Sequence, residues 1–343
     1  MFPLSSRSHR RTGRTAAALA LLLGAVIFCL QPASADSQAR SVAAQLETLP
    51  TRLSYTFSAP DYTLDTDDAG QTAITIDGLA AETLPGDPRL PALVYTIAVP
   101  PLVDLASVRL EIDAVEQVDL PGRYELPAAA PLQRVQEGPA DVDWGPNAAT
   151  IFDGKNSAVY GHNAFFPAAP LEISNLAHMR KWRLVHLRYS PFSYNPADGR
   201  LRLVREVTAT LHFDPPQLEG DSLLELQDTL LDDDAMDLVY NAAEARAWYV
   251  GVIPDRSSPA AKPGYVIVTT NQVASNISFS AFAAHKGNMG YSVQIITEDD
   301  YDSLTGEAPN GRAEKVRKWL QGHYLSDNIL YVLLIGDPDP DDP

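Results

Sequence analysis

The sequence predicts a multidomain protein, in which an all-β sandwich-like domain precedes the opening of an α/β domain with a parallel sheet. Residues 36–215 hold short β-rich runs separated by Pro, Gly and Asp clusters, a pattern typical of antiparallel strands. Residues 264–343 alternate short apolar runs with amphipathic stretches in the order β-α-β-α-β. A chain of 343 residues with 45% apolar and 20% charged residues fits two globular units with cores of their own.

Residues 1–35 have the layout of a secretory signal peptide. They contain no acidic residue and four arginines, and an apolar run over 16–30 leads to the small-residue triplet 33–35. That run is shorter than the roughly 20 residues that span a bilayer, which favours export with cleavage after Ala35 over a stable membrane anchor. Cys29, the only cysteine, lies inside the run, where we interpret it as filler.

Composition narrows the possible functions of the exported chain. Loss of the four N-terminal arginines would move the net charge from -18 to about -22. No basic stripe remains to neutralise a phosphate backbone, so nucleic acid is not an expected partner. Without Cys29 the exported segment has neither a disulfide nor a thiol nucleophile.

The β-rich segment, residues 36–215, shows its strands by composition and by alternation. In the last run, Val207, Ala209, Leu211 and Phe213 fall on one face, as expected of a half-buried antiparallel strand. Residues 195–199 read Asn-Pro-Ala-Asp-Gly, a turn between two strands. The other predicted strands cover residues 73–76, 93–99, 107–112 and 183–189.

Residues 216–263 change to an acidic, helical pattern that predicts a connector between the domains. The segment contains the triplet Asp232-Asp233-Asp234 and ends in a Pro/Ser-rich stretch, the most protease-sensitive composition in the chain. Arg246, Arg256 and Lys262 are the candidate processing positions there. The alternative is that each is an ordinary surface cation.

Residues 264–343 open a parallel sheet. The runs 265–268 and 330–335 are continuously apolar, as strands buried on both faces should be. Between them, Ala313, Val316, Leu320 and Tyr324 form one stripe of a helix. Three strands and two helices cover such a sheet poorly, so we expect the natural chain to continue beyond Pro343.

Several motifs, in this order along the chain, carry a family resemblance. They are Gly86-Asp-Pro-Arg-Leu-Pro91, Ile97-Ala-Val-Pro-Pro101, Tyr194-Asn-Pro196 before Gly199, Gly264-Tyr-Val-Ile-Val-Thr-Thr270, Phe282-Ala-Ala-His-Lys-Gly287 and Tyr331-Val-Leu-Leu-Ile-Gly-Asp337. Together they resemble a gingipain-type cysteine peptidase precursor, over nearly the whole segment after residue 35. The resemblance implies a pro-domain over 36–215 and the N-terminal part of a caspase-like catalytic domain over 264–343.

The resemblance further implies a secreted or cell-surface endopeptidase that hydrolyses peptide bonds with a Cys/His dyad. Its partners would be protein and peptide substrates, and its pro-domain would contact the catalytic domain. In that family the dyad comes from later strands, so this chain is expected to be inactive as it stands. Of its histidines, His162 lies in the β-rich segment, and His285 and His323 lie on predicted helices, where solvated or capping roles are expected.

Asp337 is the one candidate metal ligand. In gingipains the aspartate of this Gly-Asp pair ligates a structural calcium, and a carboxylate at a strand end suits that hard cation. Asp339, Asp341 and Asp342 would add oxygens. The alternative is a solvated acidic loop.

Two other functions stay open. The chain is also interpretable as a non-catalytic secreted binding or adhesion protein that uses its β domain. Nucleotide binding ranks last, because no Gly-rich turn lies between Thr270 and Phe279. Asn276-Ile277-Ser278 has the form of a glycosylation acceptor, and equally that of a helix cap.

Overall fold

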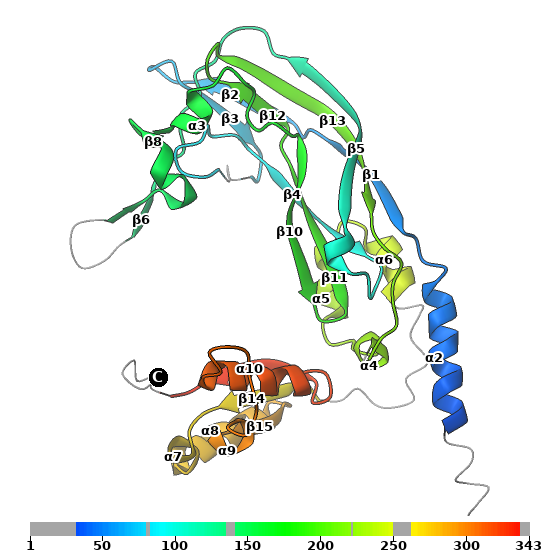
Figure 1. Ribbon diagram of the computed structural model, residues 1–343. Coiled ribbons are helices and arrows are strands. Elements are labelled where there is room, and N and C mark those ends of the chain that lie inside the picture. The colour runs from blue at the N-terminus through cyan, green and yellow to red at the C-terminus, as the bar shows by residue number, and fades with distance from the viewer. Residues whose placement is uncertain (1–31, 80–82, 135–140, 221, 250–261, 337–343) are drawn as a thin grey trace, which may run out of the picture. The chain divides into compact units, whose positions relative to one another are not determined.

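The computed structural model describes residues 32–79, 83–134, 141–220, 222–249 and 262–336 (Figure 1). The chain divides into two compact units, residues 1–48 and residues 49–343. In the first unit, helix α2 (Pro32–Leu46) replaces the β-rich pattern expected from Asp36 onward. Its sequence is rich in Ala, which favours helix, and strand-like alternation of apolar residues is weak there.

Two antiparallel sheets build the β domain. In the first, β13 (Arg200–His212) pairs with β1 (Arg52–Ser58), β5 (Arg109–Asp119) and β12 (Phe192–Asn195). The second has the order β10 (Leu171–Met179), β11 (Trp182–Tyr189), β4 (Leu93–Val99). The predicted strands coincide with these elements and β3, except that residues 107 and 108 precede β5 and Phe213 follows β13. The prediction of an all-β domain is confirmed.

A shared core between the sheets makes the domain sandwich-like. Val207 and Leu211 of β13 are fully buried in one cluster with Phe57 of β1, Ile97 of β4 and Val185 of β11. Because side chains alternate along a strand, this burial confirms the apolar face predicted for residues 207–213. On the other face, hydroxyl pairs such as Thr56–Thr208, 2.9 Å between oxygens, link β1 to β13.

Smaller elements complete the β domain. They are β2 (Tyr62–Thr66), β3 (Thr72–Ile76), η1 (Leu105–Ser107), β6 (Leu132–Arg134), β7 (Asp141–Asp143), η2 (Gly145–Thr150), β8 (Ile151–Phe152), β9 (Lys155–Asn156) and α3 (Ser157–Tyr160). The predicted turn after β12 is present: the N–H of Gly199 donates to the carbonyl of Asn195 at 2.9 Å, and Gly199 has a φ of 69°. Glycine tolerates this left-handed conformation, which explains its place at the end of the turn.

Residues 222–249 form three helices, and the second and third pack into the β-domain core. They are α4 (Ser222–Leu226), α5 (Asp232–Leu238) and α6 (Ala242–Tyr249). Ala235, Ala245 and Tyr249 are buried in the same cluster as the two sheets. The ring of Tyr249 stacks on Trp182 of β11 with ring centroids 4.0 Å apart. The helical character predicted for this segment is confirmed, and the packing of α5 and α6 makes these two helices part of the core.

The α/β segment has the predicted order of elements. It comprises β14 (Gly264–Val268), α7 (Asn271–Ala274), α8 (Ile277–Asn288), β15 (Ser292–Ile296), α9 (Glu298–Tyr301), α10 (Arg312–His323) and β16 (Ile329–Leu334). All strand pairs are parallel, in the order β15-β14-β16. This confirms the predicted start of a parallel α/β domain. Val266 and Val268 pack with Trp319 of α10 on one face of the sheet.

The other face and the β16 edge are only partly covered. Central strand β14 is buried as predicted, but in β16 Tyr331 is 47% and Leu334 is 70% exposed. The sequence predicted burial of β16 on both faces, and the structure differs because, within the described residues, β16 pairs with β14 alone. An exposed apolar edge strand is a surface suited to further protein contact.

Candidate functional site

The carboxyl ends of β14, β15 and β16 meet at one edge of the parallel sheet, where open α/β sheets place their ligands. The chain leaves β14 through Thr270, whose hydroxyl caps α7 by accepting from the N–H of Val273 at 3.2 Å. The carboxylate of Glu298, which follows β15, accepts from the N–H of Asn271 at 2.8 Å. Glu298 therefore ties the two strand ends together through the start of α7.

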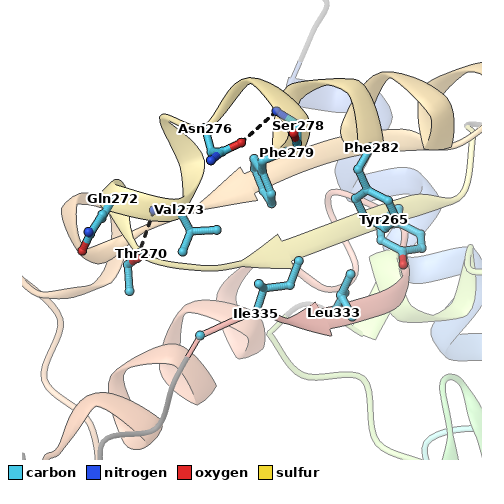
Figure 2. Close-up of a pocket in the computed structure, with 11 residues that line it drawn as sticks. Tyr265, Thr270, Gln272, Val273, Asn276, Ser278, Phe279, Phe282, Leu333 and Ile335 are labelled. Carbon is cyan, nitrogen blue, oxygen red and sulfur yellow. Dashed lines mark hydrogen bonds between the residues drawn. The ribbon is translucent and has the colours of Figure 1, made fainter.

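An apolar groove of about 1080 Å³ opens beside this edge (Figure 2). Leu333 and Ile335 form its floor with Tyr265 of β14, and Phe279 and Phe282 of α8 form the opposite wall. Its remaining lining residues are Thr270, Gln272, Val273, Asn276, Ser278 and Gly336. The groove thus lies between α8 and the partly covered face of the sheet.

The polar residues of the groove serve local structure. Asn276 accepts from the N–H of Ser278 at 2.8 Å as the cap of α8, as Thr270 does for α7. The cap explains Asn276 without a chemical role, one of the two alternatives that its sequence left open. Among the described lining residues none is Cys, His, Asp, Glu, Lys or Arg, so this groove offers apolar contact area and neither a thiol nucleophile nor a base that would activate a hydroxyl.

The candidate calcium ligand and part of the processing candidates lie outside the described residues. Asp337 is one of these, so calcium binding stays a prediction, as do ligand roles for Asp339, Asp341 and Asp342. Arg256 is outside them as well, and for Ala35 only a helical backbone is described. Within the described ranges, no group of three or more His, Cys, Asp or Glu side chains is arranged to hold a metal ion.

Of the three histidines considered in the sequence, one has a structural role and two are exposed. His323 stacks on Trp319 with ring centroids 4.1 Å apart, and its Nδ1 lies 2.7 Å from the carbonyl oxygen of Trp319. His285 is exposed in the last turn of α8, and His162 is exposed just after α3 in the β domain. None of them lines the groove.

The two described processing candidates differ in local structure. Arg246 is exposed on α6, whose neighbouring residues Ala245 and Trp248 are buried in the β-domain core. Lys262 is exposed in non-helical backbone two residues before β14. Because proteases bind their substrates in extended form, cleavage at Arg246 requires α6 to unfold first.

We therefore predict that limited trypsin digestion of the chain cuts the bond after Arg246 at least about tenfold more slowly than the bond after Arg256, the trypsin site in the Pro/Ser-rich stretch. Mass spectrometry of the fragments over time measures the rates. A digest of the urea-unfolded chain is the control, since there the difference should vanish. Early cleavage at Arg246 in the folded chain would contradict the packing of α6 on the β-domain core.

A search against protein-family models finds two matches in the order expected of a precursor. The C25 propeptide model (Propeptide_C25) matches residues 51–236, more than half of the chain. The chain belongs to the C25 propeptide family. The model of peptidase family C25 matches residues 258–343, so the parallel sheet of this C25 precursor is the start of a peptidase domain.

Solved structures similar to the C25 precursor include two from Porphyromonas gingivalis. One is the complex of RgpB pro- and mature domains: 15% identity, 56% of this chain and 93% of that chain covered, TM-score 0.40. The other concerns the zymogenic latency of gingipain K: 17% identity, 49% of this chain and 90% of that chain covered, TM-score 0.36. A comparison with curated protein sequences finds no match.

Two parts of the C25 precursor were not singled out from its sequence. One is the groove between α8 and the sheet. The other is a basic turn, residues 180–183, which the structure pairs with acidic residues of α4, of α5 and of the segment between them. The signal in the sequence was the Arg-Lys pair just before the strand predicted at 183–189. The acidic residues that bind this turn lie more than forty positions further along the chain. Among the described residues, no helix is both long and apolar enough to cross a membrane.

Proposed function

We propose that the complete protein is an exported cysteine-type endopeptidase precursor, found outside the cell or at its surface. The observation that carries the proposal is the order of the two family matches, a C25 propeptide followed by a C25 peptidase segment. The layout of residues 1–35, with its arginines and apolar run, supports export. The substrates would be proteins and peptides.

The proposal assigns different roles to the parts of the chain. The β domain, with helices α5 and α6 in its core, acts as the pro-domain. The α/β segment supplies the central strand β14 and the helices on each face of the sheet. A C25 peptidase uses a cysteine thiolate paired with a histidine, and the only cysteine of these 343 residues is Cys29 in the N-terminal apolar run. The proposal therefore places the dyad in sequence outside these residues.

The groove and the β16 edge support that assignment through their chemistry. Both are apolar and partly exposed, and the groove lining contains no Cys, His, Asp, Glu, Lys or Arg. Such surfaces are suited to packing against further parts of the same domain. In this proposal their role is to bind the rest of the catalytic domain, with the chemistry supplied elsewhere.

The test begins with sequencing the source DNA or transcript across the codon for Pro343. The proposal expects an open frame that leads to a cysteine and a histidine at the ends of later strands. Expression of that frame should then give peptide hydrolysis that iodoacetamide abolishes, and a Cys→Ala variant should be inactive. A stop codon at that position would overturn the proposal and favour a non-catalytic binding protein that uses its β domain.

A further inference from the structure

The β10–β11 hairpin carries a basic turn, Arg180 to Arg183, in an unusual backbone conformation. Met179 pairs with Trp182, so Arg180 and Lys181 form a two-residue turn. Arg180 has a φ of 54°, in the left-handed region that glycine tolerates and other side chains disfavour. An arginine at such a position indicates that contacts of its side chain offset the conformational free energy that this backbone costs.

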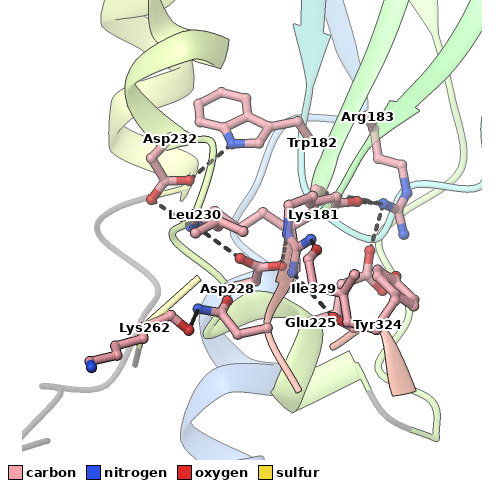
Figure 3. A network of polar contacts seen from close by, with 12 residues as sticks. Lys181, Trp182, Arg183, Glu225, Asp228, Leu230, Asp232, Lys262, Tyr324 and Ile329 are labelled. Carbon is pink, nitrogen blue, oxygen red and sulfur yellow. Dashed lines mark hydrogen bonds and ion pairs between the residues drawn. The ribbon is translucent and has the colours of Figure 1, made fainter. Parts of the chain in front are cut away.

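Three acidic residues of the α4–α5 segment face this turn (Figure 3). Lys181 Nζ lies 2.9 Å from Asp232 Oδ2, and Arg183 Nη1 lies 2.6 Å from Glu225 Oε1. Arg180 pairs with Asp228, and the side chains of this pair are only 10% and 5% exposed. Asp228 is fixed in turn by the N–H of Leu230, which donates to its Oδ1 at 3.0 Å. The guanidinium of Arg180 is therefore held in place by its own domain.

The same guanidinium reaches the α/β segment. Its Nη1 donates to the carbonyl of Ile329, the first residue of β16, at 2.6 Å, and its Nη2 lies 3.4 Å from the carbonyl of Tyr324. It also lies 5.6 Å from the centroid of the Tyr324 ring. Tyr324 is the C-cap of α10, where the helix dipole favours a cation, and its carbonyl also accepts from the N–H of Ile329 at 3.0 Å.

We propose that Arg180 is the recognition residue by which the pro-domain binds the peptidase domain, and that residues 324–329 form its docking surface. The partner chemistry matches: a guanidinium oriented by Asp228 meets two carbonyl oxygens and an aromatic face. This surface lies where β16 begins, at the opposite end of the strand from the groove. The contact thus holds the pro-domain on the peptidase domain without occupying the carboxyl end of the sheet.

The inference rests on the proposed function for the identity of the two domains, but its test reads only their association. A specific protease site is inserted between residues 250 and 261 of the full chain. After complete cleavage, gel filtration at a series of dilutions gives the dissociation constant of the two fragments. This readout is independent of peptidase activity, so it separates failure of the contact from failure of the proposed function.

The main variant is Arg180→Gly combined with Asp228→Asn. Glycine suits the left-handed turn, and asparagine avoids a buried unpaired carboxylate while keeping an acceptor for the N–H of Leu230, so the β domain should fold. We expect the dissociation constant to rise about 10- to 100-fold, the effect of losing charge-assisted hydrogen bonds. Arg180→Lys should give an intermediate value, because it keeps the charge and loses the fork of donors.

The matched control is Arg205→Ala, which removes an exposed arginine paired with Glu116 at 3.6 Å on β13. It should leave the dissociation constant unchanged. Circular dichroism confirms that each variant is folded before cleavage. The proposal is overturned if the parent fragments separate at once after cleavage, or if the double variant stays associated as tightly as the parent.

Discussion

Replacing Trp182 with alanine is expected to lower the free energy of unfolding of the β domain by about 3 to 5 kcal/mol. Trp182 is 1% exposed, and its ring stacks on Tyr249 at an interplanar angle of 14°. Its Nε1 donates to Asp232 Oδ1 at 3.0 Å. The substitution therefore opens a cavity between β11 and α6 and removes a hydrogen bond to a charged group. A loss of this size is a large part of the stability of an ordinary domain.

The hydrogen bonds of Tyr249 show why the contact between β11 and α6 is sensitive to substitution. Its hydroxyl donates to the carbonyl of Val99 at 2.7 Å and accepts from the N–H of Arg183 at 2.9 Å. Burial raises the pKa of Tyr249, so the hydroxyl keeps its proton and its donor role even at a pH where an exposed tyrosine would ionise. Loss of the Trp182 ring would expose these hydrogen bonds to water as well.

Urea unfolding followed by circular dichroism measures the effect, since the substitution itself changes tryptophan fluorescence. Trp182→Phe keeps an aromatic ring on Tyr249 and should cost about 1 to 2 kcal/mol, mainly for the hydrogen bond to Asp232. Phe152→Ala is the control, because Phe152 is 79% exposed and its removal should change stability by less than about 0.5 kcal/mol. Equal effects of Trp182→Ala and Phe152→Ala on the free energy of unfolding would contradict a stabilising role of the stacking between Trp182 and Tyr249.

Local periodicity was enough to predict the individual strands and the order of elements. In β13, Val207, Ala209 and Leu211 alternate with polar residues, which matches the two-residue repeat of a strand and predicts one apolar face. Those side chains are buried together in the structure. The same holds for β14 and for α10, where Val316, Leu320 and Tyr324 pack on the sheet. These features follow from residues close together in sequence.

Contacts between distant residues were not predictable from one sequence. The acidic run at 232–234 indicates a solvated helix by itself, yet Asp232 binds Lys181 and Trp182, and Ala235 is buried. The apolar run in β16 predicts burial, but exposure depends on which strand lies beside it. The groove likewise needs α8 and β16 to be placed on the same face of the sheet, and the turn at Arg180 needs partners from α4 and from the end of α10.

Replacing Asn241 with alanine should destabilise the docking of α6 by about 2 to 4 kcal/mol. Strand β4 is at the edge of its sheet, and the Asn241 side chain acts there as a substitute for a further strand. Its Oδ1 accepts from the N–H of Ala98 at 2.9 Å, and its Nδ2 donates to the carbonyl of Ala98 at 2.9 Å. Ala98 is 0% exposed, so the substitution leaves a buried donor and a buried acceptor unpaired.

The readout that distinguishes this role from a general loss of packing is trypsin cleavage at Arg246, which should become at least about tenfold faster as α6 detaches. Asn241→Asp separates hydrogen bonding from volume. Its carboxylate keeps an acceptor for the N–H of Ala98 but turns an oxygen toward the Ala98 carbonyl and toward Glu244, so it should destabilise at least as much as alanine at neutral pH. Asn175→Ala, at an exposed position of β10, is the matched control and should behave like the parent chain. If Asn241→Asp left both the stability and the cleavage rate unchanged, the amide would not be pairing the β4 edge, and α6 would be held by Trp182 and Tyr249 alone.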